Sequence, residues 1–250
     1  MSGHSKWANI KHRKSAQDAK RGKEFQKYIK AVMVASKEGG PDPAMNIRLK
    51  SAIERARAAN VPVDTIDKAI KKGSGDMEGV NYDEITYEGY GAGGVAVLVE
   101  VLTDNKNRTA SEMRFLFSRS GGSLGEAGCV SWIFQRTGVI RVSGKELDEE
   151  QLLAACLEAG ADDLEDNGEG YSVYCEPAAM SAVRGSLEEA GYVVEGFEID
   201  NLPKNTVPVT GRQEAEKLLR FLEALEEHDD VQNVYANFDI PDEIMEEIAG

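Results

Sequence analysis

Basic residues near the start of the chain are the strongest chemical signal in the sequence. Six side chains of types that bind nucleic acid occur within the first 14 residues: Lys6, Trp7, Lys11, His12, Arg13 and Lys14. Several cations on one surface favour a phosphate backbone, because each neutralised phosphate releases counterions. The tryptophan ring offers a face on which an exposed base can stack. The pattern predicts a basic arm that contacts nucleic acid.

The basic character continues into two predicted helices. Apolar residues recur at helical spacing over residues 16–38, and the ~100° rotation per residue places the lysines on the opposite face. A second helix follows Asp42, the expected N-cap, and Pro43, and it ends near residue 60. The candidate contacts in the two helices are Lys20, Arg21, Lys23, Lys27, Lys30, Arg48, Arg55 and Arg57. The alternative for this lysine face is a merely solvated surface.

Charge separates sharply along the chain. Residues 1–75 hold 17 Lys and Arg against 7 Asp and Glu, a balance of +10, so the other 175 residues hold 12 against 37, a balance of −25. Such asymmetry is typical of a protein with a polyanion-binding end and an end that repels polyanions. The asymmetry also argues against the alternative that the lysines of the basic end are merely solvated.

The order of predicted elements indicates an α+β multidomain fold. Residues 1–75 form a basic arm and a small helical domain, whose third short helix is capped by Asp64. The elements of residues 136–204 follow the order βαββαβ, which is typical of ferredoxin-like folds. Residues 76–135 and 205–240 are expected to pair as a second ferredoxin-like domain into which that block is inserted. Residues 241–250 are expected to be an acidic C-terminal end.

The sequence contains none of the motifs that signal catalysis. It has no Gly-x-Ser-x-Gly, His-Glu-x-x-His or Walker motif. The glycine-rich segment 89–94 is followed by a predicted strand and not by a helix, so we expect a hairpin turn and no phosphate cradle. Cys129, Cys156 and Cys175 match neither a disulfide framework nor a zinc site. We therefore expect no enzyme, no cofactor and no metal, and small buried or half-buried thiols.

The distribution of apolar residues bears on where the protein is located. No stretch approaches the ~20 apolar residues that cross a bilayer, and the polar, basic N-terminus is unlike a secretory signal. We expect a cytoplasmic protein that has no contact with membranes and is a monomer.

Several segments together resemble the YebC family. They are His4–Lys14 (HSKWANIKHRK), Ile53–Asn60 (IERARAAN), Ala69–Gly73 (AIKKG), Tyr87–Gly91 (YEGYG), Leu102–Asn105 (LTDN) and Val231–Tyr235 (VQNVY). The resemblance implies one helical and two α/β domains, and it implies no catalytic residues. Family members are described as probable transcriptional regulatory proteins that bind DNA. Mitochondrial relatives are translational activators of cytochrome c oxidase, and bacterial members have been linked to the ribosome.

Three functions are therefore weighed. The first is a DNA-binding transcriptional regulator that uses the basic helical domain. The second is a ribosome-associated translation factor whose basic arm binds ribosomal RNA while its acidic domains lie elsewhere. The third is an enzyme that uses a cleft between the α/β domains, which the lack of paired catalytic motifs disfavours. The absence of a clear recognition helix weakens sequence-specific DNA reading.

Overall fold

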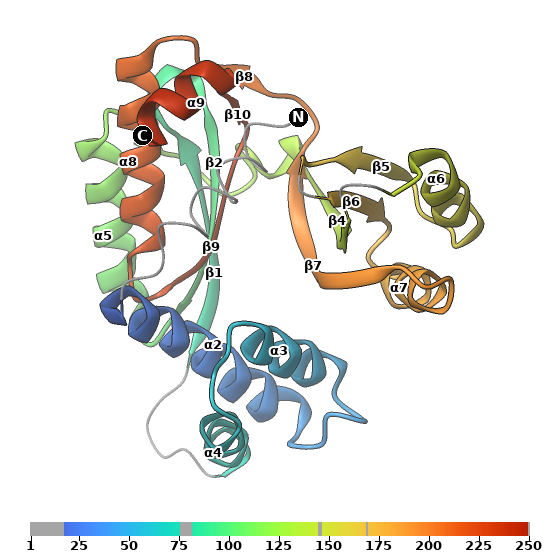
Figure 1. The fold of residues 1–250 in the computed structure, drawn as a ribbon. Helices are drawn as coiled ribbons and strands as arrows, with labels where there is room; N and C mark the ends of the chain where they lie inside the picture. Colours follow the sequence, from blue (N-terminus) through green and yellow to red (C-terminus); the bar gives the residue numbers. More distant parts are fainter. Residues whose placement is uncertain (1–17, 76–81, 145–146, 169, 250) are drawn as a thin grey trace.

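The computed structural model describes residues 18–75, 82–144, 147–168 and 170–249. Three bodies follow one another along the chain: a bundle of helices, a sheet covered by helices, and a smaller sheet with two helices of its own (Figure 1). This arrangement confirms the predicted α+β class, in which a helical part precedes two parts that contain sheets.

Three helices form the N-terminal bundle: α2 (Asp18–Gly39), α3 (Ile47–Ala58) and α4 (Val63–Ser74). Their apolar faces meet in one core, which includes Val32, Leu49, Ile53 and Ile66. The long first helix has one apolar stripe because its hydrophobic residues recur every three or four positions.

Both predicted N-caps in this bundle are wrong. The residue that caps α3 is Asn46, whose Oδ1 accepts from the Leu49 amide at 3.0 Å, while Asp42 accepts from Ala44 N within the preceding turn. Asn46 is buried and its side-chain amide also donates to two backbone carbonyls, so it ties the α2–α3 loop to the helices. The last helix, α4, begins at Val63 after Pro62 and has no side-chain cap, so Asp64 lies in its first turn.

The first sheet has the strand order β3-β1-β2-β9 and is antiparallel throughout. Its strands are β1 (Asp83–Tyr90), β2 (Ala96–Thr103), β3 (Ser123–Leu124) and β9 (Val231–Ala236). As predicted, the C-terminal strand β9 returns to pair with β2. The prediction of a second ferredoxin-like domain here is wrong, because β1 and β2 form a central hairpin with no α-helix between them. Two helices, α5 (Lys106–Arg119) and α8 (Arg212–Glu226), cover one face (Figure 1). Their aromatic rings Phe117 and Phe221 meet edge to face at 5.0 Å in the core.

The second sheet has the order β5-β6-β4-β7, again antiparallel. Its elements are β4 (Phe134–Ser143), α6 (Glu149–Glu158), β5 (Asp163–Asp166), β6 (Gly170–Cys175), α7 (Met180–Glu189) and β7 (Val193–Pro203). This strand order and the βαββαβ sequence are those of a ferredoxin-like unit, as predicted. Gly168 adopts a φ of 82° in the β5–β6 hairpin, a left-handed conformation that glycine adopts without strain.

Shorter elements complete the structure. The glycine-rich segment between β1 and β2 holds a 3₁₀ turn, η1 (Ala92–Gly94), in a hairpin, and Gly93 and Gly94 have φ of 72° and 78°. Another 3₁₀ turn, η2 (Ser131–Ile133), precedes β4, and β8 (Val207–Pro208) pairs with β10 (Phe238–Asp239). The expected acidic end forms a helix, α9 (Asp242–Ala249), that buries Met245 in the core of the first sheet. The apolar residues Ile244, Met245 and Ile248 of this acidic helix pack on that core.

A buried carboxylate joins the helical bundle to the first sheet. Asp230, just before β9, is 5% exposed and receives Nζ of Lys30 from α2 at 3.0 Å and Nη2 of Arg108 from α5 at 2.6 Å. Thr103 and Thr109 hydroxyls lie 3.0 and 2.9 Å from its Oδ2. Burial by itself would raise the pKa of this carboxyl, but the hydrogen bonds from Arg108, Lys30 and Thr109 outweigh it and hold the pKa well below its usual range.

Two further carboxylates join the sheets. Glu88 on β1 accepts from the backbone amides of Gly128, Val130 and Ser131, each at 2.8 Å, and so fixes the loop that leads into β4. Burial raises the pKa of this carboxyl, and the three amides more than offset that, so the pKa lies below its ordinary value. The loop is thereby held against the sheet through hydrogen bonds to a single side chain.

Glu100 on β2 has the corresponding role on the open face of the first sheet. Its Oε2 accepts from Nδ2 of Asn233 at 2.7 Å and from the hydroxyl of Tyr235 at 3.2 Å, and its Oε1 from Nδ2 of Asn201 on β7 at 3.3 Å. From the helical bundle, Arg55 Nη2 reaches Asn233 Oδ1 at 3.4 Å. One polar network therefore contacts all three bodies.

We predict that Asp230→Asn lowers the free energy of unfolding by about 3 kcal/mol at pH 7, because Lys30, largely buried, loses its charged partner. The folded pKa of Asp230 lies below the unfolded value of about 3.9. The contribution of the ionised carboxylate to the free energy of unfolding is therefore present above the unfolded pKa, and it is lost as the pH falls towards the folded pKa. In urea denaturation, the difference in the free energy of unfolding between wild type and variant should become smaller as the pH falls below about 5.

Asp229→Asn is the matched control. The neighbouring side chain is 78% exposed and lies 3.7 Å from Lys23 Nζ, so the same substitution should cost less than about 0.5 kcal/mol. Equal unfolding free energies for the Asp230 variant and wild type at pH 7 would contradict the role assigned to this carboxylate.

Candidate nucleic-acid interface

The arm residues predicted to contact nucleic acid are outside the part of the chain that the structure describes. They are Lys6, Trp7, Lys11, His12, Arg13 and Lys14. Lys20 and Arg21 lie within α2, but their side chains are also outside the described part. These eight residues remain predictions from the sequence.

Two of the remaining lysines of α2 are held inside the joint with the first sheet. Lys27 donates to the backbone carbonyl of Glu226, at the end of α8. Lys30 contacts the carbonyls of Leu102 and Asp229 at 3.3 and 3.2 Å, in addition to the carboxylate of Asp230. Burial lowers the pKa of Lys27, against the opposing effect of the nearby acidic groups. The prediction that these two lysines face solvent is therefore wrong.

The physical reason is that α2 packs on two sides. One face meets α3 and α4, as the apolar periodicity indicates, and part of the opposite face lies on the corner where α8 meets β9 (Figure 1). The stems of long lysine side chains cover apolar surface while their ammonium groups reach polar partners. Lys23, one turn earlier, stays exposed, and its Nζ lies 3.7 Å from the carboxylate of Asp229.

The three arginines of α3 differ in their surroundings. Arg48 makes ion pairs with Glu38 of α2 and Glu84 of β1. Arg55 points towards Asn233 on the open face of the first sheet. Arg57 is exposed, and no acidic side chain in the described ranges lies within ion-pair distance of it. The three arginines of α3 therefore have different partners, and Arg57 is the one for which the described ranges show no ion pair.

Sequence reasoning missed the lysines of α4. Lys68, Lys71 and Lys72 carry positive charge on this helix, and Lys68 and Lys72, one turn apart, line a groove between α4 and α2. The available signal was the helical spacing of Thr65, Lys68, Ala69 and Lys72, which places them on one face. The buried Ile66 of the same helix predicted only a short core helix, so these lysines were not predicted as contacts.

The rest of the described chain offers little chemistry. Cys156 and Cys175 are buried and Cys129 is half-buried, as predicted. Burial raises the pKa of the Cys156 thiol to about 11 and also raises the pKa values of Cys129 and Cys175, so these thiols are protonated and weakly nucleophilic at neutral pH. Across the described ranges, no cluster of three or more His, Cys, Asp or Glu side chains is arranged to hold a metal ion.

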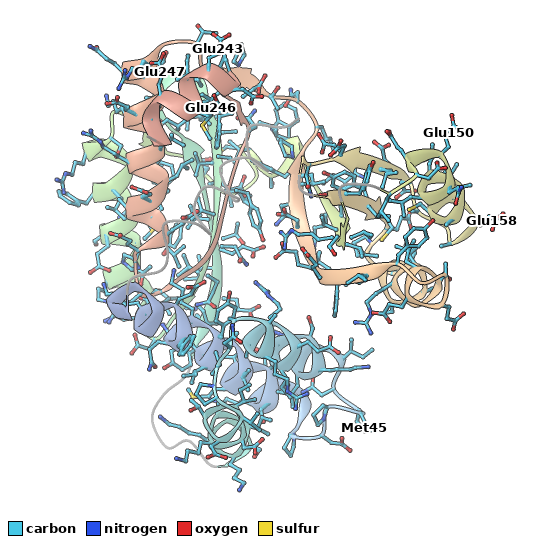
Figure 2. The ribbon with its side chains drawn as sticks, in the orientation of Figure 1. Met45, Glu150, Glu158, Glu243, Glu246 and Glu247 are labelled. Carbon is cyan, nitrogen blue, oxygen red and sulfur yellow. The ribbon has the colours of Figure 1, made fainter. Side chains whose placement is uncertain are left out.

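Several exposed acidic side chains lie away from the helical bundle. Figure 2 shows Glu150 and Glu158 on α6 at one extremity and Glu243, Glu246 and Glu247 on α9 at another, while Met45 marks the outer end of the bundle. Within the described ranges, no helix combines the length and apolar character needed to cross a membrane.

Comparison with known proteins agrees with this architecture over almost the whole chain. The model of the TACO1/YebC protein N-terminal domain matches residues 5–76, and that of the TACO1/YebC second and third domain matches residues 82–238. The crystal structure of a conserved hypothetical protein from Aquifex aeolicus superposes with a TM-score of 0.81 at 47% identity, covering 91% of this chain and 94% of that one.

Similar sequences carry the name "Probable transcriptional regulatory protein". The relative from Dictyoglomus thermophilum is 55% identical over 250 residues, which is 100% of both chains. The relative from Thermotoga maritima is 55% identical over 249 residues, covering 99% of this chain and 98% of the relative. By the family models and by these identities, the chain belongs to the TACO1/YebC family, whose relatives are named as regulatory proteins.

Proposed function

We propose that this protein is a cytoplasmic DNA-binding regulator of transcription, which acts by binding and not by catalysis, through its N-terminal arm and helical bundle. The observation that carries the proposal is the charge partition. A balance of +10 in residues 1–75 adjoins a balance of −25 in the rest of the chain. A polyanion is attracted to the first part and repelled by the second. The names of the relatives support a regulatory role.

The proposed interface consists of the arm and the exposed cations of the bundle. It includes the predicted residues Lys6, Trp7, Lys11, His12, Arg13, Lys14, Lys20, Arg21, Lys23 and Arg57, together with Lys68 and Lys72. Lys27 and Lys30 are left out because their ammonium groups bond within the protein. Contacts of this kind neutralise phosphates and carry no sequence information by themselves.

A ribosomal partner is the second candidate, and the acidic surfaces favour it. Repulsion from phosphate is screened beyond ~8–10 Å at physiological salt, so the acidic bodies matter only where they lie near the nucleic acid. On a ribosome they would face basic proteins while the bundle binds ribosomal RNA. Co-sedimentation with ribosomal particles that survives DNase and vanishes on deletion of residues 1–30 would favour this candidate. Recovery only at specific promoters would exclude it.

Replacing Lys11, Arg13 and Lys14 together by Ala should weaken binding to all duplex sequences alike. The slope of log affinity against log salt should become shallower by about 1 for each phosphate that the variant no longer neutralises. The measurement is fluorescence anisotropy of a labelled duplex at several salt concentrations. The control replaces Arg114, Arg136 and Lys217 in the two α/β bodies and changes the net charge equally. An unchanged slope in the arm variant would contradict the proposed interface.

Lys30→Gln should change the stability of the protein and leave its binding to nucleic acid unchanged. The loss of a largely buried charge pair should lower the free energy of unfolding by about 2 kcal/mol. The salt slope for nucleic acid should stay as in wild type, since Nζ of this lysine is bonded to Asp230 and to two backbone carbonyls and is not available to a phosphate. Denaturation gives the free energy of unfolding, and anisotropy on the same sample gives the salt slope. A shallower slope with unchanged stability would place Lys30 in the interface after all.

A further inference from the structure

The groove between α2 and α4 has the shape and charge of a ligand site. It encloses about 550 Å³, within the usual range for binding pockets. The helices approach closely at one end because residue 73 is glycine, where a Cβ would lie 2.2 Å from the Met33 carbonyl oxygen. Ser36 Oγ also donates to the Ile70 carbonyl at 2.8 Å. These contacts hold the groove in one fixed shape.

Lysines form both rims of the groove. Lys23 lies on the α2 side, and Lys68 and Lys72 on the α4 side. Within the described ranges, no carboxylate lies within 4.0 Å of Nζ of Lys68 or Lys72, so both ammonium groups are available to an anion. Among the described residues that line the groove, the acidic one is Asp229, near Lys23. The rims therefore attract a negatively charged chain.

Apolar and aromatic side chains also line the groove. They are Ile29, Met33 and Ala69 from the two helices and Tyr82, just before β1. The ring of Tyr82 is half-buried and is held by Lys30, whose Nζ lies 5.4 Å from the ring centre. Because Lys30 is in turn fixed by Asp230, the ring has a set position.

From this arrangement we propose that the groove binds a single-stranded or looped segment of nucleic acid, with phosphates on Lys23, Lys68 and Lys72 and one unstacked base against Tyr82. Cations that track a backbone beside an aromatic ring are the usual elements of single-strand sites. A regular duplex keeps its bases stacked inside and cannot place one between two helices. The inference rests on the proposed function and adds to its duplex-binding arm a separate site for unpaired strands, of DNA or RNA.

The test compares two double variants of the full chain. Lys68→Ala with Lys72→Ala removes two rim charges, whereas Lys50→Ala with Lys71→Ala removes two exposed charges outside the groove lining. Labelled 12-nucleotide single strands of DNA and of RNA, and a duplex of the same sequence, serve as probes in anisotropy titrations. The rim variant should bind single strands roughly 20-fold more weakly near 0.1 M salt, with a slope shallower by about 1.4.

Two substitutions at Tyr82 test the base contact. Tyr82→Phe keeps the ring and should leave single-strand affinity within about twofold of wild type. Tyr82→Leu keeps apolar bulk but removes the ring, and should weaken single-strand binding by roughly 5- to 100-fold while the duplex is little affected. Thermal melting of each variant confirms that the bundle remains folded. Equal affinity of the Leu and Phe variants would overturn the stacking contact.

The outcomes separate this inference from the proposed function. Unchanged single-strand binding in the rim variant, with weaker binding in the arm variant described above, would overturn the groove and leave the proposed function standing. An equal decrease in the two double variants would mean that total charge governs binding, and it would also overturn the groove. No effect from either the arm or the rim would contradict both. A preference for the RNA or the DNA strand identifies the source of the segment.

Discussion

The arrangement of the molecule depends on one buried anion. Asp230 cannot remain charged away from water without cations and hydroxyls around it, and those groups come from α2, β2 and α5. Satisfying this carboxylate therefore fixes the helical bundle against the first sheet. It also decides which lysines of α2 are engaged within the protein and which side of the bundle, with α4, stays free for a ligand.

The other joints between the three bodies combine polar contacts with a small apolar cluster, in which Leu98 and Tyr235 of the first sheet meet Phe134 at the start of β4. Glu100 bridges the first sheet to Asn201, Glu88 holds the loop before β4, and Arg48 pairs with Glu84. Hydrogen-bonded joints define orientation through geometry, whereas a large apolar interface would tolerate small shifts in register. A defined orientation keeps the acidic helices α6 and α9 at the extremities of the molecule, away from the basic bundle (Figure 2).

Local patterns predicted most of the fold correctly. Helical spacing located α2 and α3, and the order of elements identified the ferredoxin-like unit. These features succeed because each depends on neighbours in the chain. The caps failed because several capping residues were available nearby, and the buried one, Asn46, was selected by its contacts with the α2–α3 loop. Periodicity does not reveal such contacts.

The separation of charge can be read from the sequence, because composition is independent of folding, and so can the period of each helix and strand. What each lysine does depends on contacts that form only when the chain folds. Lys27 and Lys30 meet backbone carbonyls and a carboxylate from residues about 70 to 200 positions away in the chain. The groove likewise needs α2, α4 and Tyr82 side by side. A helix's sequence specifies which side chains share a face, but the partner of that face is chosen by packing across the whole chain.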